Sequence, residues 1–64
     1  MFSERLKLAR KRAGLSLRDL EKRLNRQVSA QAIGKYERGE MMPGSPVLIA
    51  LARALEVSVG YLMS

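Results

Sequence analysis

Hydrophobic residues recur at spacings of three and four along most of the chain, which is the period of an amphipathic helix. Five short segments carry such a stripe or a helix cap, and breakers such as Gly14, Gly39 and Pro43 separate them. Alternating apolar residues never persist, so no strand pattern competes. The pattern therefore predicts an all-α fold, a compact bundle of five short helices in a single domain over residues 1–64.

The first two helices are predicted over about 3–13 and about 17–24. Gly14 ends the first helix, because glycine tolerates left-handed backbone angles. Ser16 is a favourable N-cap for the second helix, and Asp19 lies in its first turn, where a carboxylate suits the positive end of the helix dipole. The predicted apolar stripes are Phe2, Leu6, Ala9 and Ala13 in the first helix and Leu17, Leu20 and Leu24 in the second.

The third helix is predicted over about 30–38, after a polar turn at residues 25–27. Ser29 opens it, Gly39 closes it, and Ile33 and Tyr36 face inward.

The fourth helix is predicted to begin with Ser45 as its N-cap and Pro46 at its first helical position, the arrangement that proline prefers. Ser58 is predicted to cap a last short turn. The inward stripe of the fourth helix is Leu48, Leu51, Ala52 and Leu55.

The composition argues against several classes of function. The 64 residues include no cysteine, no histidine and a single aspartate, Asp19. The usual nucleophile, general base and zinc ligands are therefore missing, so we expect no enzyme, no metal and no cofactor. No apolar run approaches the roughly 20 residues that cross a bilayer. The N-terminal segment carries charges where a secretory signal is apolar, so we expect a cytoplasmic protein.

The positive charge is unevenly distributed along the chain. Residues 1–26 hold nine basic and three acidic side chains, whereas residues 27–64 hold three of each, so the whole excess of +6 lies in the first part. Such asymmetry favours an anionic partner, either nucleic acid or a membrane surface. A solvated basic face that only keeps the protein soluble is the alternative. A basic amphipathic first helix on a membrane is a further alternative, which the caps and stripes of the other helices oppose.

Three stretches, RLKLARKRAGLSLRDL, VSAQAIGKYERGE and ALEVSVGYLM, resemble the Cro and cI-type helix-turn-helix family of phage and bacterial repressors, the XRE family. The resemblance implies a lambda-repressor-like bundle whose third helix is the recognition helix. It also implies a sequence-specific transcriptional regulator, a repressor that binds double-stranded DNA as a homodimer on a pseudo-palindromic operator. SLRDL and QAIGKYERGEMMP are most similar to N-terminal domains of regulators linked to ImmA/IrrE-type zinc metallopeptidases. A bacterial or phage origin follows from the same resemblance.

The chain departs from the family pattern in two places. The turn before the third helix carries about two extra residues, around Arg26 and Gln27. Glu21 occupies a position where a small residue is usual, on the side of the second helix that faces the third. We expect its carboxylate to reach solvent or a base such as Arg23 or Arg26, or the two helices to sit differently.

The outward face of the third helix is small, polar, small and cationic, which fits a major groove about 12 Å wide. Gln31 and Lys35 are four residues apart on this face, and Ala30 and Gly34 lie beside them. Glutamine can pair with adenine, lysine can donate to guanine, and Ala30 can touch a thymine methyl. Gly34 is expected to remove a side chain where the helix passes close to DNA. Spacing alone would favour solvated side chains, and the resemblance shifts the interpretation of Gln31 and Lys35 to base contact. It does so only weakly for Ala30 and Gly34, for which simple tolerance of a small residue is the alternative.

Candidate phosphate contacts lie at the starts of the second and third helices and beside them. Phosphate contacts supply most of the affinity and fix the register. Leu17 can contribute only its backbone N–H, so Arg18 is expected to take the side-chain role. For each arginine, a role in surface solubility is the alternative. The candidates are Arg10, Ser16, Leu17, Arg18, Ser29 and Arg38.

Two further roles follow from the resemblance and the apolar C-terminal segment. The family often pairs an arginine of the first helix with a glutamate at the end of the third, which predicts a structural ion pair between Arg10 and Glu37. Dimerisation is expected at Val57, Val59, Tyr61 and Met63, some of which must belong to the core.

A protein-interaction module is the alternative function, either an antitoxin or a docking domain of a larger protease-linked regulator. Met41 and Met42 would then join the C-terminal apolar residues in the contact patch, because methionine adapts to binding surfaces.

Overall fold

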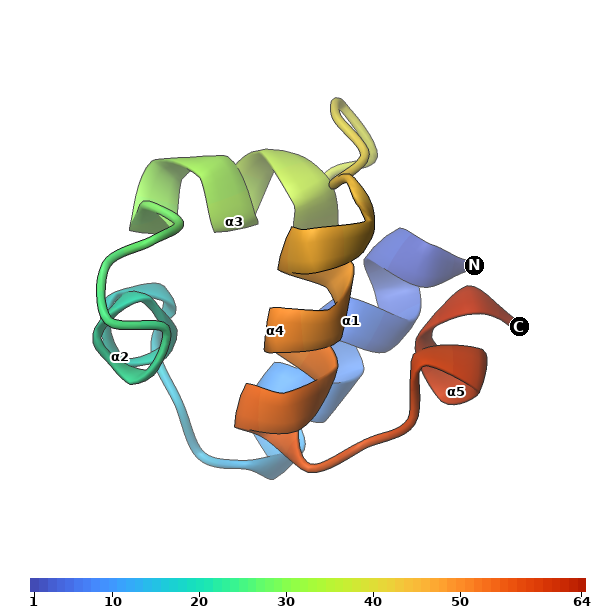
Figure 1. The fold of residues 1–64 in the computed structure, drawn as a ribbon, viewed down its shortest axis with the longest axis horizontal. Helices are drawn as coiled ribbons and strands as arrows, with labels where there is room; N and C mark the ends of the chain where they lie inside the picture. The colour runs from blue at the N-terminus through green and yellow to red at the C-terminus, as the bar shows by residue number, and fades with distance from the viewer.

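The computed structural model describes residues 1–64 and contains five helices and no strand. The helices are α1 (Phe2–Arg12), α2 (Leu17–Arg23), α3 (Ala30–Glu37), α4 (Ser45–Leu55) and α5 (Val59–Met63). In Figure 1, α3 lies along one side of the molecule, α1 passes behind α4, and the two chain ends lie near each other beside α5. The predicted all-α bundle of five helices is confirmed.

One hydrophobic core joins all five helices. Leu6, Leu20, Ile33, Leu51 and Leu62, one from each helix, are fully buried. The other core side chains are Phe2, Ala9, Leu24, Val28, Tyr36, Ala52 and Leu55.

The structure corrects one expectation about α1 and opposes the membrane alternative. Ala13 is exposed, because α1 ends at Arg12 and Ala13 is its C-cap residue. The apolar face of α1, with Phe2 and Leu6, is buried in the core and cannot lie on a membrane surface. In addition, none of the helices is long and apolar enough to cross a membrane.

Most helix ends lie where local chemistry places them. Gly14 and Gly39 follow α1 and α3 with φ of +73° and +75°. The hydroxyl oxygens of Ser16, Ser29 and Ser58 each accept a backbone N–H in the first turn of the helix that they cap. Side-chain oxygens at these positions satisfy N–H groups that have no partner within the helix. The predicted caps of the second, third and fifth helices are therefore confirmed.

The predicted cap of the fourth helix is wrong by one residue. Ser45 is the first residue of α4, and Gly44 is the N-cap, without a side-chain hydrogen bond. The carbonyl oxygen of Gly44 accepts the N–H of Leu48 at 2.9 Å. Pro46 is tolerated throughout the first turn, because the N–H that it lacks would have no helical partner there. The proline therefore marks the start of the helix without fixing which residue begins it.

Candidate nucleic-acid interface

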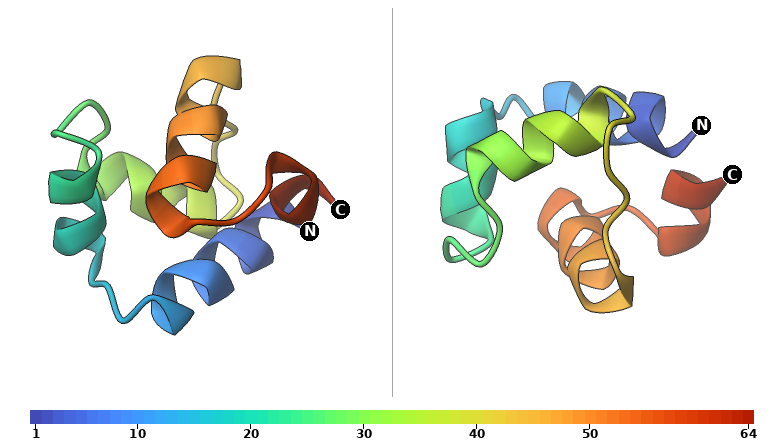
Figure 2. Two further views of the ribbon diagram at one scale, coloured as in Figure 1. Left: turned by 60° about the horizontal axis from the view of Figure 1, so that its bottom comes forward. Right: turned by 90° about the horizontal axis from the view of Figure 1, so that it is seen from above.

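The second and third helices pack together and leave one side of α3 open. Ile33 and Tyr36 face the core, and α3 rests on α2 and on α1. Figure 2 shows α2 and α3 joined by the turn that precedes Ala30, with α3 running along the outside of the bundle. Two short helices joined by a turn, with polar residues on the outer side of the second, form a helix-turn-helix unit.

A reciprocal capping box fixes the start of α2. The N–H of Asp19 donates to Ser16 Oγ at 3.0 Å, and the N–H of Ser16 donates to Asp19 Oδ2 at 2.9 Å. The Ser16 hydroxyl acts only as an acceptor in this box, as does the Ser29 hydroxyl, which accepts the N–H of Ala32 at 3.0 Å. Each serine therefore keeps its hydroxyl proton for an outside acceptor such as a phosphate.

Because of the capping box, the stability of the fold should depend on the protonation of Asp19 at acid pH. The hydrogen bond from the Ser16 backbone N–H lowers the pKa of Asp19 below its ordinary value of 3.8. A lowered pKa in the folded state means that the stabilisation is present above that ordinary value and is lost as the pH falls below it. We expect the melting temperature of Asp19→Asn to fall less than that of the parent protein between about pH 4 and pH 2. An unchanged acid slope in this variant would contradict the assignment.

Three polar side chains lie on α3 or directly after it. Gln31 and Arg38 are exposed, and Lys35 is half-buried. The side chains of Gln31 and Lys35 make no hydrogen bond within the protein, so their donors are free to meet a ligand. Ala30 is half-buried at the start of the helix.

Gly34 is not on this open face. It is buried, and a Cβ built on it would lie 3.1 Å from Arg38 Nη1 and 3.7 Å from Leu17 Cδ1. The sequence placed Gly34 beside Gln31 and Lys35, and that placement is wrong because the start of α2 and the Arg38 side chain cover the position. Packing between α2 and α3 therefore accounts for a small residue here. The base contact expected for Gly34 stays a prediction.

Three further candidates for phosphate contact, Leu17, Arg18 and Arg38, lie in α2 or directly after α3. Arg18 is exposed and has no ion-pair partner within the protein. Arg38 Nε donates to Glu40 Oε2 at 2.7 Å, which raises the pKa of Arg38 and lowers that of Glu40. The two terminal guanidinium nitrogens of Arg38 remain for another acceptor. Leu17 is half-buried, and as the first residue of α2 its N–H lacks a helical partner.

Arg10 is held inside the protein. Its Nε and Nη2 donate to the two carboxylate oxygens of Glu37 at 2.7 and 3.0 Å, and its Nη1 donates to the carbonyl oxygen of Leu15 at 2.8 Å. Only 10% of the Arg10 side chain and 6% of the Glu37 side chain are exposed. The hydrogen bond to Glu37 raises the pKa of Arg10. The structure thus forms the expected ion pair, whereas the phosphate contact expected for Arg10 is wrong because its guanidinium is turned inward.

Glu21 makes a contact that the sequence did not reveal. Its Oε1 accepts the N–H of Ala30, the first residue of α3, at 3.3 Å. Glu21 remains partly exposed, as expected, but it forms no ion pair with Arg23 or Arg26, and Arg23 instead donates to the carbonyl oxygen of Ala54 at 3.3 Å. The extra length of the turn and the glutamate at position 21 were the two sequence signals for an unusual α2–α3 junction.

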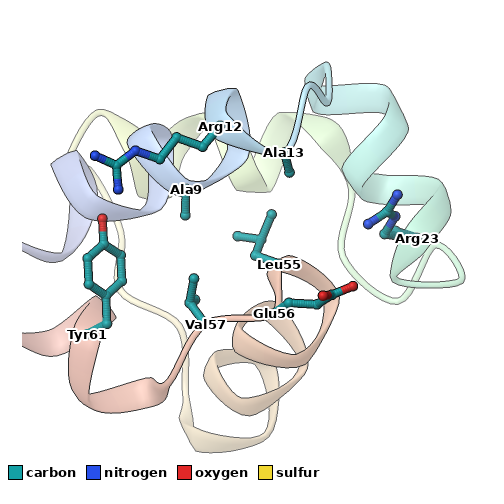
Figure 3. A pocket seen from close by; sticks show the side chains of 8 residues that line it. All are labelled: Ala9, Arg12, Ala13, Arg23, Leu55, Glu56, Val57 and Tyr61. Carbon is teal, nitrogen blue, oxygen red and sulfur yellow. The ribbon is translucent and has the colours of Figure 1, made fainter.

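Some of the positive charge lies away from α3. Arg12 and Arg23 border a groove of about 410 Å³ between α1, the end of α2 and the α4–α5 connection. Figure 3 shows Leu55 and Val57 on its apolar floor and Glu56 near Arg23. In Figure 1 these ends of α1 and α4 lie on the side opposite α3. The excess charge of the first 26 residues is therefore divided between two sides of the molecule.

The residues expected at a dimer contact are mostly packed on the core. Val57, Val59 and Tyr61 are partly buried against it, and 49% of Met63 is exposed. Arg5 contacts Tyr61 in two ways. Arg5 Nη1 donates to the Tyr61 carbonyl oxygen at 3.3 Å, and the Arg5 guanidinium lies 4.8 Å from the centroid of the Tyr61 ring. The dimer contact at these residues stays a prediction.

A family model described as helix-turn-helix matches residues 6–62, which includes every helix in whole or in part. The chain belongs to the helix-turn-helix family. This helix-turn-helix family comprises DNA-binding domains of XRE-type transcription regulators and is not a family of enzymes. No curated protein and no solved structure matches the chain.

Proposed function

We propose that this helix-turn-helix protein is a sequence-specific transcriptional repressor that places α3 in the major groove of its operator. The observation that carries the proposal is the open face of α3, where Gln31 and Lys35 have no partner within the protein. An amide and an ammonium offer the donors and acceptors that discriminate base pairs in the major groove. Ala30, at the start of the same helix, completes the proposed base-contact set on this face.

The proposed phosphate contacts flank this face at the starts of both helices. Ser16 and Ser29 each keep a hydroxyl donor after capping, and the N–H of Leu17 has no helical partner. Arg18 and Arg38 add the cations. Contacts of this kind would fix the register of α3 without reading sequence.

The proposed repressor binds as a homodimer on a pseudo-palindromic operator, as dimeric helix-turn-helix proteins do with half-sites about 34 Å apart. Met63 is the most exposed of the four proposed contact residues at the C-terminal end. The same family resemblance would place the domain at the N-terminus of a regulator linked to an ImmA/IrrE-type metallopeptidase.

Selection from a random duplex library tests this proposal. An enriched palindrome is expected, and Gln31→Ala should lose about 1–3 kcal/mol of discrimination at one base pair of each half-site. Lys35→Ala should lower the discrimination at a different base pair by a similar amount. Gln27→Ala is the control, because Gln27 is an exposed glutamine in the turn outside α3. Binding without enrichment, or equal effects of Gln27→Ala and Gln31→Ala, would overturn base reading by α3.

A protein-interaction module is the second candidate function, as an antitoxin or a docking domain. The loop between α3 and α4 leaves Met41 39% and Met42 58% exposed, next to the end of the recognition helix. An apolar contact at these methionines should be insensitive to salt, whereas DNA binding must weaken as salt rises. Failure to bind any duplex at low salt would favour this candidate.

A further inference from the structure

One residue, Glu21, connects both ends of the turn between α2 and α3. Its backbone carbonyl oxygen accepts the N–H of Arg26 at 2.9 Å, and its side-chain Oε1 accepts the N–H of Ala30 at 3.3 Å. The first bond closes the end of α2, and the second holds the first residue of α3. Glu21 thereby joins the helix that is proposed to contact phosphates to the helix that is proposed to read bases.

The turn that Glu21 spans would not hold its shape by local preference. Asn25 and Arg26 are consecutive non-glycine residues with φ of 55° and 61°. Left-handed backbone is unfavourable for most L-residues. Asparagine adopts it readily, but Arg26 keeps it only where the surrounding structure imposes it. The Asn25 N–H donates to the carbonyl oxygen of Lys22 at 2.9 Å, which adds a second bond on the α2 side. On the α3 side, the Glu21 carboxylate accepts the Ala30 N–H, and this hydrogen bond links α2 to the start of α3.

The carboxylate of Glu21 also changes the local charge. It lines a surface hollow with three cations, Arg18, Lys22 and Arg26, and forms no ion pair with any of them. A carboxylate in this hollow repels a phosphate that approaches Arg18. A negative charge is at the same time favourable at the N-terminus of α3. The side chain therefore has two separable effects, a hydrogen bond that orients α3 and a charge that opposes phosphate.

We infer that Glu21 is a positioning residue that sets the orientation of the recognition helix, at a cost in affinity for the DNA backbone. This inference rests on the proposed function, because it assigns Glu21 a role in the same DNA contact. The orienting effect should raise the ratio of specific to non-specific affinity. The charge should lower both affinities together.

Two substitutions separate these effects. Glu21→Gln keeps an oxygen acceptor for the Ala30 N–H and removes the charge, whereas Glu21→Ala removes both and favours the helix conformation of α2. Glu56→Gln is the matched control, because it removes the same charge in the groove on the side away from α3. The affinity of each protein is measured for the selected operator and for a scrambled duplex.

Glu21→Ala is expected to lower the ratio of specific to non-specific affinity by about tenfold, the loss typical of a hydrogen bond to a charged group. Glu21→Gln should keep the ratio within about twofold and raise affinity for both duplexes several-fold. Glu56→Gln should change neither quantity. An unchanged ratio in Glu21→Ala, or an equal loss in Glu21→Gln and Glu21→Ala, would overturn the inference.

A measurement without DNA separates this inference from the proposed function. Amide hydrogen exchange at Ala30 should be faster in Glu21→Ala than in the parent protein and unchanged in Glu21→Gln. If the parent protein binds no duplex, the proposed function fails, and the exchange at Ala30 still tests whether Glu21 holds the start of α3. If Glu21→Ala does not fold, Glu21→Gln supplies the test: a reduced specificity ratio or faster Ala30 exchange would then contradict the inference.

Discussion

Glu37→Ala is expected to destabilise the fold by about 3–5 kcal/mol, because it leaves the Arg10 guanidinium charged and without its partner in a nearly buried site. The free energy of unfolding of a small domain is about 5–15 kcal/mol, so this loss would remove a large part of it. The midpoint of urea denaturation at neutral pH is the measurement. A midpoint equal to that of the parent protein would show that Arg10 finds another partner or water.

Two comparisons make this prediction specific to the buried pair. Glu40→Ala breaks the ion pair with Arg38, whose side chains are 57% and 52% exposed, and exposed pairs contribute little. We therefore expect its urea midpoint to stay near that of the parent. The double variant Arg10→Met with Glu37→Leu should recover most of the stability lost in Glu37→Ala, because an apolar pair leaves no charge buried.

The position of Arg10 explains why this pair matters for α3. Arg10 belongs to α1, its Nη1 holds the Leu15 carbonyl oxygen in the loop before α2, and Glu37 is the last residue of α3. One guanidinium therefore connects three parts of the chain. The family resemblance suggested the pair, but only the packed structure reveals that all three guanidinium nitrogens bond within the protein, which removes Arg10 from the phosphate contacts.

Features that depend on neighbouring residues could be predicted from the sequence. The caps at Ser16, Ser29 and Ser58 act within one helical turn, and Gly14 and Gly39 adopt the backbone angles that end a helix. The periodic leucines predicted the helices and most of the core. These elements required no knowledge of distant contacts, so a single sequence was sufficient.

Features that depend on contacts across the α2–α3 turn could not be predicted. The small residue at Gly34 looked like space for DNA, because the sequence did not show that Leu17 and Arg38 cover it. Glu21 reaches Ala30, nine residues away, only because Asn25 and Arg26 both take left-handed angles. Asparagine often adopts left-handed angles but arginine does not, so the path of the turn through Arg26 could not be predicted from the sequence.

DNA affinity is expected to fall by roughly 150-fold when salt rises fourfold, if Arg18 and Arg38 from both subunits each neutralise one phosphate. Four such contacts correspond to a slope of log affinity against log salt of about −3.6. Arg18 has no ion-pair partner, and Arg38 engages Glu40 only through Nε, so both can meet phosphate without breaking a contact. The measurement is a titration of the selected operator at about 50 and 200 mM salt.

Arg18→Ala should remove two of these contacts from a dimer, reduce the slope to about −1.8 and leave only a roughly twelvefold loss over the same change in salt. Arg12→Ala is the matched control, because it removes the same charge from the groove away from α3 and should leave the slope unchanged. Equal slopes for the two variants would mean that the net charge, rather than contacts beside α3, governs binding. A smaller slope for Arg12→Ala alone would place the DNA on the groove side, because counterion release follows the cations that meet phosphate.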